Sequence, residues 1–257
     1  MPIVLDKPPG WTLLESIDAL RRVEPALATA RLGYAGRLDP MAEGVLLVLR
    51  DDENREAAQF RALDKTYRVQ VLFGVATDSY DALGLVSEAK PAPSLARVHA
   101  ALPSLERTFE QAVPAFSSHR VNGKPMFHWA RRGLADTIVR PVLTRTVSEL
   151  LAENDALVEP ATLCESIAER IARVRGDFRQ GAIVARWRSV LASHTEPLLV
   201  TTLRITCSSG TFMRAIAHDL GHALGSAAIA LAIERLRVGP YERSAGRAIG
   251  HARSDTP

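Results

Sequence analysis

A single aspartate in a glycine-rich loop is the first residue of this sequence that could do chemistry. Asp39 stands near the end of the decapeptide from Arg31 to Pro40, in which Gly33 and Gly36 allow a close approach of the backbone. A carboxylate held beside a substrate can act as a nucleophile or stabilise a developing positive charge. An aspartate in such a loop is, however, more often a turn former. The residues alone leave both interpretations open.

Two histidines one helical turn apart are a second candidate. His218 and His222 have the spacing of a zinc-binding helix. The residue after the first histidine is Asp219 rather than glutamate, Gly221 weakens the helix, and no clear third ligand follows. We therefore predict no metal site, and a metal-dependent hydrolase is only a third hypothesis.

Arginine supplies nearly all the positive charge of the chain, whose formal net charge is +3 at pH 7. Arginine suits bidentate phosphate contacts and stacking on bases, although a codon bias towards arginine explains the same composition. Residues 120–145 form a basic segment, in which Asp136 is the single acid and the cations are Arg120, Lys124, Arg131, Arg132, Arg140 and Arg145. This segment predicts a surface that contacts the phosphates of a nucleic acid.

The composition is that of an ordinary globular protein, with 47% apolar and 24% charged residues. Two cysteines, Cys164 and Cys207, are too few for a disulfide framework, which favours a reducing compartment. The N-terminus does not have the pattern of a signal peptide, and no apolar run approaches the roughly 20 residues of a membrane helix. We therefore expect a cytoplasmic protein that does not enter a membrane.

The elements that would position these residues are a mixture of helices and strands. The capping-box spacing of Thr12 and Glu15 predicts a helix after residue 12. Residues 31–40 are predicted as a loop, followed by a buried strand over 45–49. Strict alternation predicts a strand over 66–73 with Tyr67 on its apolar face.

Later elements continue the mixture. Helices are predicted after Ser94 and Pro160, a strand over 201–207, and a last helix after Gly210. Residues 153–160 are the best candidate for a loosely packed connection. Because strands and helices do not alternate regularly, this order favours an α+β fold over a doubly wound sheet.

Five blocks of sequence, in order along the chain, stand out as motifs. The first is Asp-Lys-Pro-Pro-Gly-Trp-Thr at residues 6–12, and the second is Gly-Tyr-Ala-Gly-Arg-Leu-Asp-Pro at residues 33–40. The others are residues 64–67 with 74–84, residues 114–133, and residues 207–221 continued by 235–239. Together these blocks resemble the motifs of the TruB family of tRNA pseudouridine synthases. One block would be a weak signal, but five in order make the resemblance specific.

The resemblance implies a fold and a reaction. The expected fold has a mixed, mostly antiparallel central sheet flanked by helices. The expected reaction breaks the N1–C1′ glycosidic bond of a uridine, turns the uracil and rejoins it through C5, so that no cofactor is needed. In this family Asp39 corresponds to the nucleophile, Arg214 to its ion-pair partner, and Tyr67 to a tyrosine that stacks on the flipped base. On their residues alone, Arg214 is an ordinary surface arginine and Tyr67 a core residue of a strand.

The resemblance also assigns residues to the substrate and to support of the site. The residues expected to bind substrate are Tyr34, Asp81, Arg120, Lys124, Arg131 and Arg132. Those expected to support the site are Lys7, Pro8, Gly36 and Leu38. Asp81 is equally well explained as a turn residue. Tyr34 stands where the family usually has a histidine, and it can stack on a base but cannot supply an imidazole hydrogen bond.

The resemblance extends to both ends of the chain. We expect residues 1–257 to form a single catalytic domain with a less family-like inserted segment at about 134–199, and without the C-terminal PUA-type domain of many relatives. The predicted partner is the T-arm of tRNA, with the uridine at position 55 as target, and the chain is expected to be a monomer. The alternative, favoured by Tyr34, is a non-catalytic relative that binds or folds tRNA.

Overall fold

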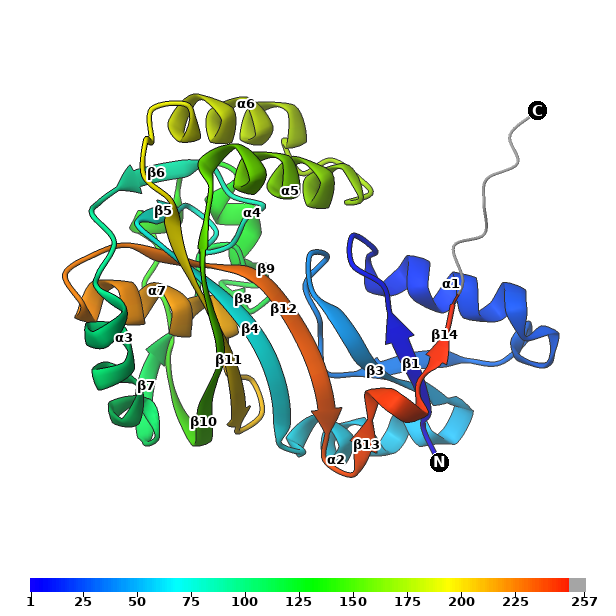
Figure 1. The fold of residues 1–257 in the computed structure, drawn as a ribbon. Coiled ribbons are helices and arrows are strands. Elements are labelled where there is room, and N and C mark those ends of the chain that lie inside the picture. Colours follow the sequence, from blue (N-terminus) through cyan, green and yellow to red (C-terminus); the bar gives the residue numbers. More distant parts are fainter. Residues whose placement is uncertain (250–257) are drawn as a thin grey trace.

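A large sheet runs through the computed structural model, which describes residues 1–249 (Figure 1). Within these residues the sheet has ten strands in the order β14-β1-β3-β12-β4-β11-β10-β7, with β2 paired to β3 and β13 to β12. Its strands are β1 (Ile3–Lys7), β2 (Leu32–Ala35), β3 (Glu43–Arg50), β4 (Lys65–Phe73), β7 (Thr108–Ala112), β10 (Val142–Val158), β11 (Leu198–Cys207), β12 (Ala228–Val238), β13 (Tyr241–Glu242) and β14 (Arg247–Ala248).

Short strands and helices complete the described chain. Two separate pairs are β5 (Val75–Thr77) with β6 (Val86–Ala89), and β8 (Arg120–Val121) with β9 (Lys124–Pro125). The α-helices are α1 (Leu13–Val23), α2 (Ala57–Ala62), α3 (Leu95–Ala101), α4 (Met126–Ala130), α5 (Pro160–Ala172), α6 (Gln180–Leu191) and α7 (Met213–Ala223). The 3-10 turns are η1 (Pro25–Leu27), η2 (Asp51–Glu56), η3 (Leu102–Leu105), η4 (Ala135–Thr137) and η5 (Arg243–Ala245).

Most neighbouring strands of the main sheet are antiparallel. The central strand β4 pairs antiparallel with both β11 and β12, and β10 pairs antiparallel with β11 and β7. The two parallel pairs among the described strands are β12 with β3 and β1 with β14. The predicted α+β fold with a mixed, mostly antiparallel sheet is therefore confirmed.

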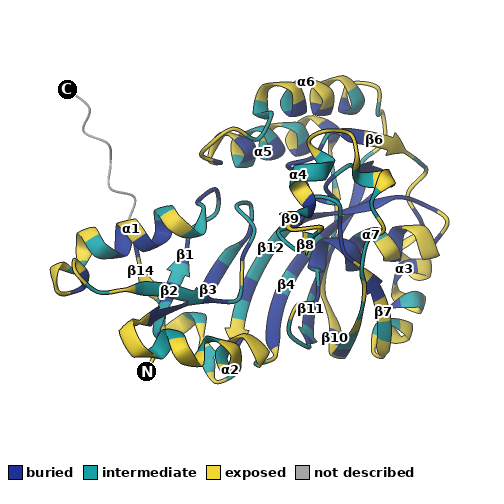
Figure 2. Ribbon diagram, turned by 180° about the vertical axis from the view of Figure 1, so that it is seen from behind, coloured by how far each residue is buried: buried dark blue, intermediate teal, exposed yellow. Residues whose placement is uncertain are grey.

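Helices cover both faces of the central strands. The side chains of β4 alternate between these two faces, so the strand contributes to a core on each side. Val69, Val71 and Phe73 belong to a core shared with α7 and α3. Leu72 points the other way, into a core shared with α5 and α6. Figure 2 shows these strands largely buried between helices whose outer faces are exposed. The central sheet is thus buried between two cores, and the predicted strand over 66–73 is confirmed.

The outer part of the sheet is covered by α1 and α2. The capping box of Thr12 and Glu15 starts α1 as predicted, with the Thr12 side chain accepting from the Glu15 N–H. Leu46 and Val48 of β3 pack with α1, whereas Val45, Leu47 and Leu49 pack on the opposite face, with residues of α2 among their neighbours. A strand buried on both faces explains the unbroken apolar run of residues 45–49.

Two predictions of local structure are wrong. Residues 32–35, predicted as a loop, form β2, because they pair with the edge of β3. Residues 153–158, predicted as part of a loose connection, belong to β10, and α5 begins directly at Pro160. The segment 134–199 supplies β10, α5 and α6, and its status as an insertion stays a prediction.

No helix within residues 1–249 is both long and apolar enough to cross a membrane.

Candidate active site

A charge-assisted hydrogen bond joins Asp39 and Arg214. Asp39 lies in the loop between β2 and β3, and Arg214 lies in the first turn of α7. The guanidinium Nε of Arg214 donates to Oδ2 of Asp39 at 2.8 Å. The Arg214 side chain is 4% exposed, whereas that of Asp39 is 45% exposed. The fold therefore presents an open carboxylate on a fixed cation, and its exposure leaves room for a substrate atom to approach.

Three further acceptors hold the Arg214 guanidinium. Its Nη1 donates to the Ser79 carbonyl at 2.6 Å, and its Nη2 donates to the Phe116 carbonyl at 3.0 Å. Its Nε also lies 3.5 Å from Oδ2 of Asp81. Burial opposes the positive charge, but the carboxylates of Asp39 and Asp81 outweigh burial and raise the pKa of Arg214. The cation is consequently fixed in both position and charge.

Asp81, predicted to bind substrate, lies behind Arg214. Its buried carboxylate accepts from the Ser79 hydroxyl at 2.6 Å and from the Leu83 N–H at 3.0 Å, both through Oδ1. Burial raises the pKa of Asp81 to about 6, even though Arg214 favours the charged form. These contacts are those of a residue that supports Arg214, and a direct contact of Asp81 with RNA stays a prediction.

Lys7 ties down the loop that carries Asp39. It is fully buried, and its Nζ donates to the carbonyls of Pro8 at 3.0 Å, Pro40 at 3.2 Å and Ala42 at 2.6 Å. Burial lowers the pKa of Lys7 to about 7. Two of the three carbonyls follow Asp39 within three residues, so Lys7 holds this loop. The supporting role of Lys7 and Pro8 in the reaction stays a prediction.

Arg235 supports the site, although the sequence placed it only in the last of the resembling blocks and in a C-terminal run of arginines that predicted phosphate contacts. This arginine of β12 is 1% exposed, and its Nε donates to the Val45 carbonyl at 2.7 Å. Its Nη1 and Nη2 donate to the carbonyls of Arg37 at 2.9 Å and Gly36 at 3.2 Å. Gly36 has φ +81°, a left-handed conformation that glycine adopts easily. The available signal was the pair of charged residues, Glu234 and Arg235, that follows the apolar stretch of β12, residues 228–233.

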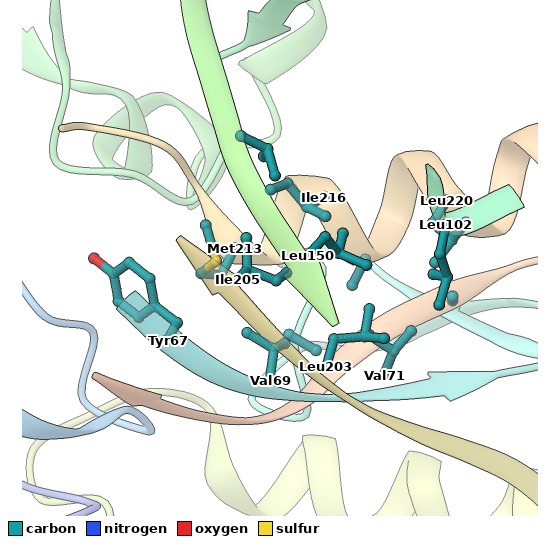
Figure 3. Close-up of a cluster of buried hydrophobic side chains, with 14 of the residues drawn as sticks. Tyr67, Val69, Val71, Leu102, Leu150, Leu203, Ile205, Met213, Ile216 and Leu220 are labelled. Atoms are coloured by element: carbon teal, nitrogen blue, oxygen red, sulfur yellow. The ribbon is translucent and has the colours of Figure 1, made fainter. Parts of the chain in front are cut away.

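A cavity of about 570 Å³ opens beside Asp39 and is lined by Tyr67, Leu38 and Lys65, among other residues. Figure 3 shows the Tyr67 ring at the end of a core cluster near Met213, with its hydroxyl pointing away from the other labelled side chains. Burial raises the pKa of Tyr67, so the phenol stays protonated at neutral pH. A flat, polar-tipped wall of this kind suits stacking against a nucleobase.

A second cavity, of about 560 Å³, meets the first at Asp39 and Arg214, which line both. Phe127 and Phe178 contribute to its walls, and Arg131 lies close to both rings, with its guanidinium 5.7 Å and 5.6 Å from their centroids. Tyr34 also lines both cavities. Three of the predicted substrate-binding residues, Tyr34, Asp81 and Arg131, therefore line a cavity that Asp39 and Arg214 also line.

The remaining cations predicted to bind substrate lie outside the two cavities. Arg120, Lys124 and Arg132 are exposed and are absent from the described residues that line either cavity. Arg120 donates to the Gly123 carbonyl within its own β8–β9 hairpin at 2.9 Å. Arg61 of α2, which was not predicted, is exposed at the first cavity, and its guanidinium has no hydrogen-bond or ion-pair partner among the described residues.

His218, the metal candidate of the sequence analysis, stacks on another ring. The Tyr80 and His218 ring centroids are 3.8 Å apart with an interplanar angle of 13°. Burial lowers the pKa of His218 to about 4, so the ring is neutral at neutral pH. Within residues 1–249, no three His, Cys, Asp or Glu side chains gather in a way that could hold a metal ion.

Comparison with known proteins identifies the family to which this architecture belongs. Residues 24–164 match the model of the TruB family pseudouridylate synthase, N-terminal domain. The chain is 34% identical to tRNA pseudouridine synthase B of Thermobifida fusca over 241 residues, which cover 93% of this chain and 69% of that relative. The chain belongs to the TruB family. Pseudouridine synthases are isomerases, as the sequence resemblance implied.

Other relatives extend the match. The chain is 32% identical to tRNA pseudouridine synthase B of Chromohalobacter salexigens, over 95% of this chain and 65% of that protein. Of the relative from Treponema pallidum, the chain covers 57%. The chain thus spans between 57% and 69% of the length of these three TruB proteins. A solved Cbf5-Nop10-Gar1 complex contains the same fold, with a TM-score of 0.58 at 19% identity over 94% of this chain and 49% of the other.

Proposed function

We propose that this chain is a tRNA pseudouridine synthase that isomerises the T-loop uridine at position 55, with Asp39 as its nucleophile. The observation that carries the proposal is the Asp39–Arg214 pair, placed where two cavities meet and beside the Tyr67 ring. Support for tRNA as the substrate comes from the names of the TruB relatives. A cytoplasmic location and a monomeric state remain predictions.

The reaction is an isomerisation that balances without a co-reactant. The Asp39 carboxylate adds to C6 of the uracil or C1′ of the ribose, and the N1–C1′ bond breaks. The freed base turns so that C5 faces C1′, and a C5–C1′ bond forms. The bond between Asp39 and C1′ or C6 breaks, which restores the free carboxylate. The C5 proton leaves and N1 takes up a proton. Arg214 holds the carboxylate in place throughout, and the Tyr67 hydroxyl assists removal of the C5 proton.

A target uridine must leave its stack to reach Asp39. The first cavity, with Tyr67 as one wall, has room for a base that has turned out of the RNA. Tyr34 lines both cavities, and the Arg37 guanidinium lies 5.9 Å from the centroid of its ring. The ring can stack on a base in place of the usual histidine. The cations of the basic segment provide contacts to phosphates.

Tyr34 is also the observation that favours the alternative, a TruB-like protein that binds or folds tRNA without turnover. Tyrosine cannot supply the imidazole hydrogen bond of the family histidine. Against this alternative stands the complete set of buried contacts around Arg214, which a protein that only binds RNA does not need.

The proposal is tested with T-arm hairpin RNA that carries tritium at C5 of the T-loop uridine only. Isomerisation releases this tritium to water, whereas a hairpin labelled only at stem uridines should release none. Salt-sensitive binding of the hairpin without tritium release would instead establish the binding protein. Equal release from both hairpins would contradict the assignment of the T-loop position.

A further inference from the structure

Three consecutive residues, Ser79, Tyr80 and Asp81, face one side of α7. Arg214 and His218 are one helical turn apart on this helix and therefore share a face. Arg214 contacts the Ser79 carbonyl at 2.6 Å and lies 3.5 Å from the Asp81 carboxylate. His218 stacks on the ring between them, that of Tyr80. The segment and the helix thus meet at Arg214 and at the ring stack.

The backbone at Tyr80 is in an unusual conformation. Its φ of +64° is left-handed, which residues other than glycine seldom adopt and which persists only when the surroundings enforce it. In an extended strand, consecutive residues present their groups to opposite sides. Because the chain turns at Tyr80, the Ser79 carbonyl and the Asp81 carboxylate both reach the same guanidinium.

Several contacts enforce this turn. The Tyr80 N–H donates to the Thr77 carbonyl at 3.2 Å, and the Tyr80 carbonyl accepts from the Ala230 N–H of β12 at 3.0 Å. The Tyr80 hydroxyl lies 3.4 Å from Nη1 of Arg140. These bonds fix the backbone and the ring tip, whereas the flat face of the ring is held by His218.

His218 is suited to packing rather than to acid–base work. Its Nδ1 is buried and has no hydrogen-bond partner among the described residues. Burial lowers its pKa to about 4, so a neutral ring lies one helical turn away from the charged Arg214. The ring therefore supports Tyr80 without adding a positive charge next to the guanidinium.

We propose that Tyr80 and His218 are positioning residues for Arg214, whose stacked rings hold the 79–81 turn in the one conformation that presents both acceptors to the guanidinium. The proposal rests on the proposed synthase activity. It assigns a role in that activity to two residues that contact neither Asp39 nor the cavity in which the base would react. Loosening the stack should let Arg214 shift, and small displacements of catalytic groups cost large factors in rate.

The test is steady-state tritium release by the full chain carrying single substitutions. His218→Ala removes the ring, and we expect kcat to fall about tenfold or more with an unchanged KM for the RNA. His218→Phe restores a flat neutral ring and should recover most of the lost kcat. Tyr80→Gly tolerates the left-handed φ but has no ring, so it should lose kcat as His218→Ala does.

A matched control is His222→Ala. His222 lies one turn further along α7, is exposed, and meets the His218 ring edge-on at a centroid distance of 4.3 Å. This variant should keep the wild-type kcat. The double variant Tyr80→Gly with His218→Ala should be no slower than either single variant, because both remove the same stack.

Wild-type kcat in His218→Ala or Tyr80→Gly would overturn the positioning role. Failure of His218→Phe to exceed the kcat of His218→Ala would overturn it as well, since a merely structural defect does not depend on the ring. If the wild-type chain itself releases no tritium, the proposed synthase activity fails, and the positioning role fails with it. If the wild type releases tritium and His218→Ala has the same kcat, the positioning role is contradicted while the synthase activity stands.

Discussion

Arg214 donates from Nε to Oδ2 of Asp39 at 2.8 Å, although 175 positions separate the two residues in the chain. The guanidinium is almost completely buried, while nearly half of the carboxylate side chain remains exposed. This asymmetry separates two tasks. The buried partner fixes charge and position, and the exposed partner keeps an oxygen free to meet a substrate atom.

Replacing Tyr67 by phenylalanine should separate stacking from proton transfer. The ring packs in the core at the start of β4 and lines the first cavity, so Tyr67→Phe should leave the fold and the KM for RNA nearly unchanged. Loss of the hydroxyl should lower kcat by about 10²- to 10⁴-fold, the usual range for one acid–base group. Single-turnover tritium release measures this effect. A wild-type rate in Tyr67→Phe would show that the hydroxyl does not take part.

Asp81 should make the stability of the protein depend on acid pH. Its folded-state pKa of about 6 lies above its ordinary value of 3.8, so between pH 4 and 6 the folded state holds a proton that the unfolded state does not. The contribution of Asp81 to the free energy of unfolding is therefore greatest below pH 4 and is lost as the pH rises through 6. The difference between these two pKa values corresponds to roughly 3 kcal/mol in the free energy of unfolding.

The measurement compares urea unfolding of the wild type and Asp81→Asn at several pH values. The free-energy difference, wild type minus variant, should fall as the pH rises from 4 to 7, because asparagine cannot titrate. The subtraction removes the titration of every other carboxylate that the two proteins share. A difference that does not change over this interval would show that Asp81 titrates at its ordinary pKa in the folded protein.

Arg61 should contact a phosphate of the RNA. Its guanidinium is exposed at the rim of the first cavity and has no hydrogen-bond or ion-pair partner within residues 1–249. Arg61→Gln should weaken RNA binding and lower the slope of log K against log salt by about one. Arg188→Gln is the control, since Arg188 is exposed on α6 and outside the residues that line the two cavities. Equal slopes in both variants would contradict the contact.

Local patterns predicted those elements whose structure depends on neighbouring residues. The capping box of Thr12 and Glu15 starts α1, and the alternation after Tyr67 marks β4 because one face of that strand packs on α7. The apolar run of residues 45–49 predicted β3 because this strand is buried on both faces. In each case the signal lies within a few residues and reflects burial directly.

Elements that depend on a distant partner were missed. Residues 32–35 form a strand only because the edge of β3 is available to them, and their glycine and mixed polarity conceal it. The strand from Val142 to Val158 is largely exposed on its outer side, so it shows no clear alternation and its end was predicted as a loose connection.

The site was predicted through the resemblance more than through chemistry. Asp39, Tyr67 and Arg214 stand in matched motifs, and the fold brings them to one cavity. Arg235 and the carbonyl of Ser79 could not be assigned from the sequence, because their roles arise from where the chain passes in three dimensions. Arg120, Lys124 and Arg132 share the basic segment with Arg131, but only Arg131 reaches the second cavity.

The most direct test of the central claim is tritium release by Asp39→Asn, measured in a single turnover on T-arm RNA labelled at C5 of the target uridine. Asparagine keeps the size of the side chain but cannot act as the nucleophile, so the rate should fall by about 10⁴-fold or more while RNA binding is retained. Asp52→Asn, at an exposed aspartate of η2, should release tritium at the wild-type rate. Wild-type release by Asp39→Asn would contradict the assignment of Asp39 as the nucleophile.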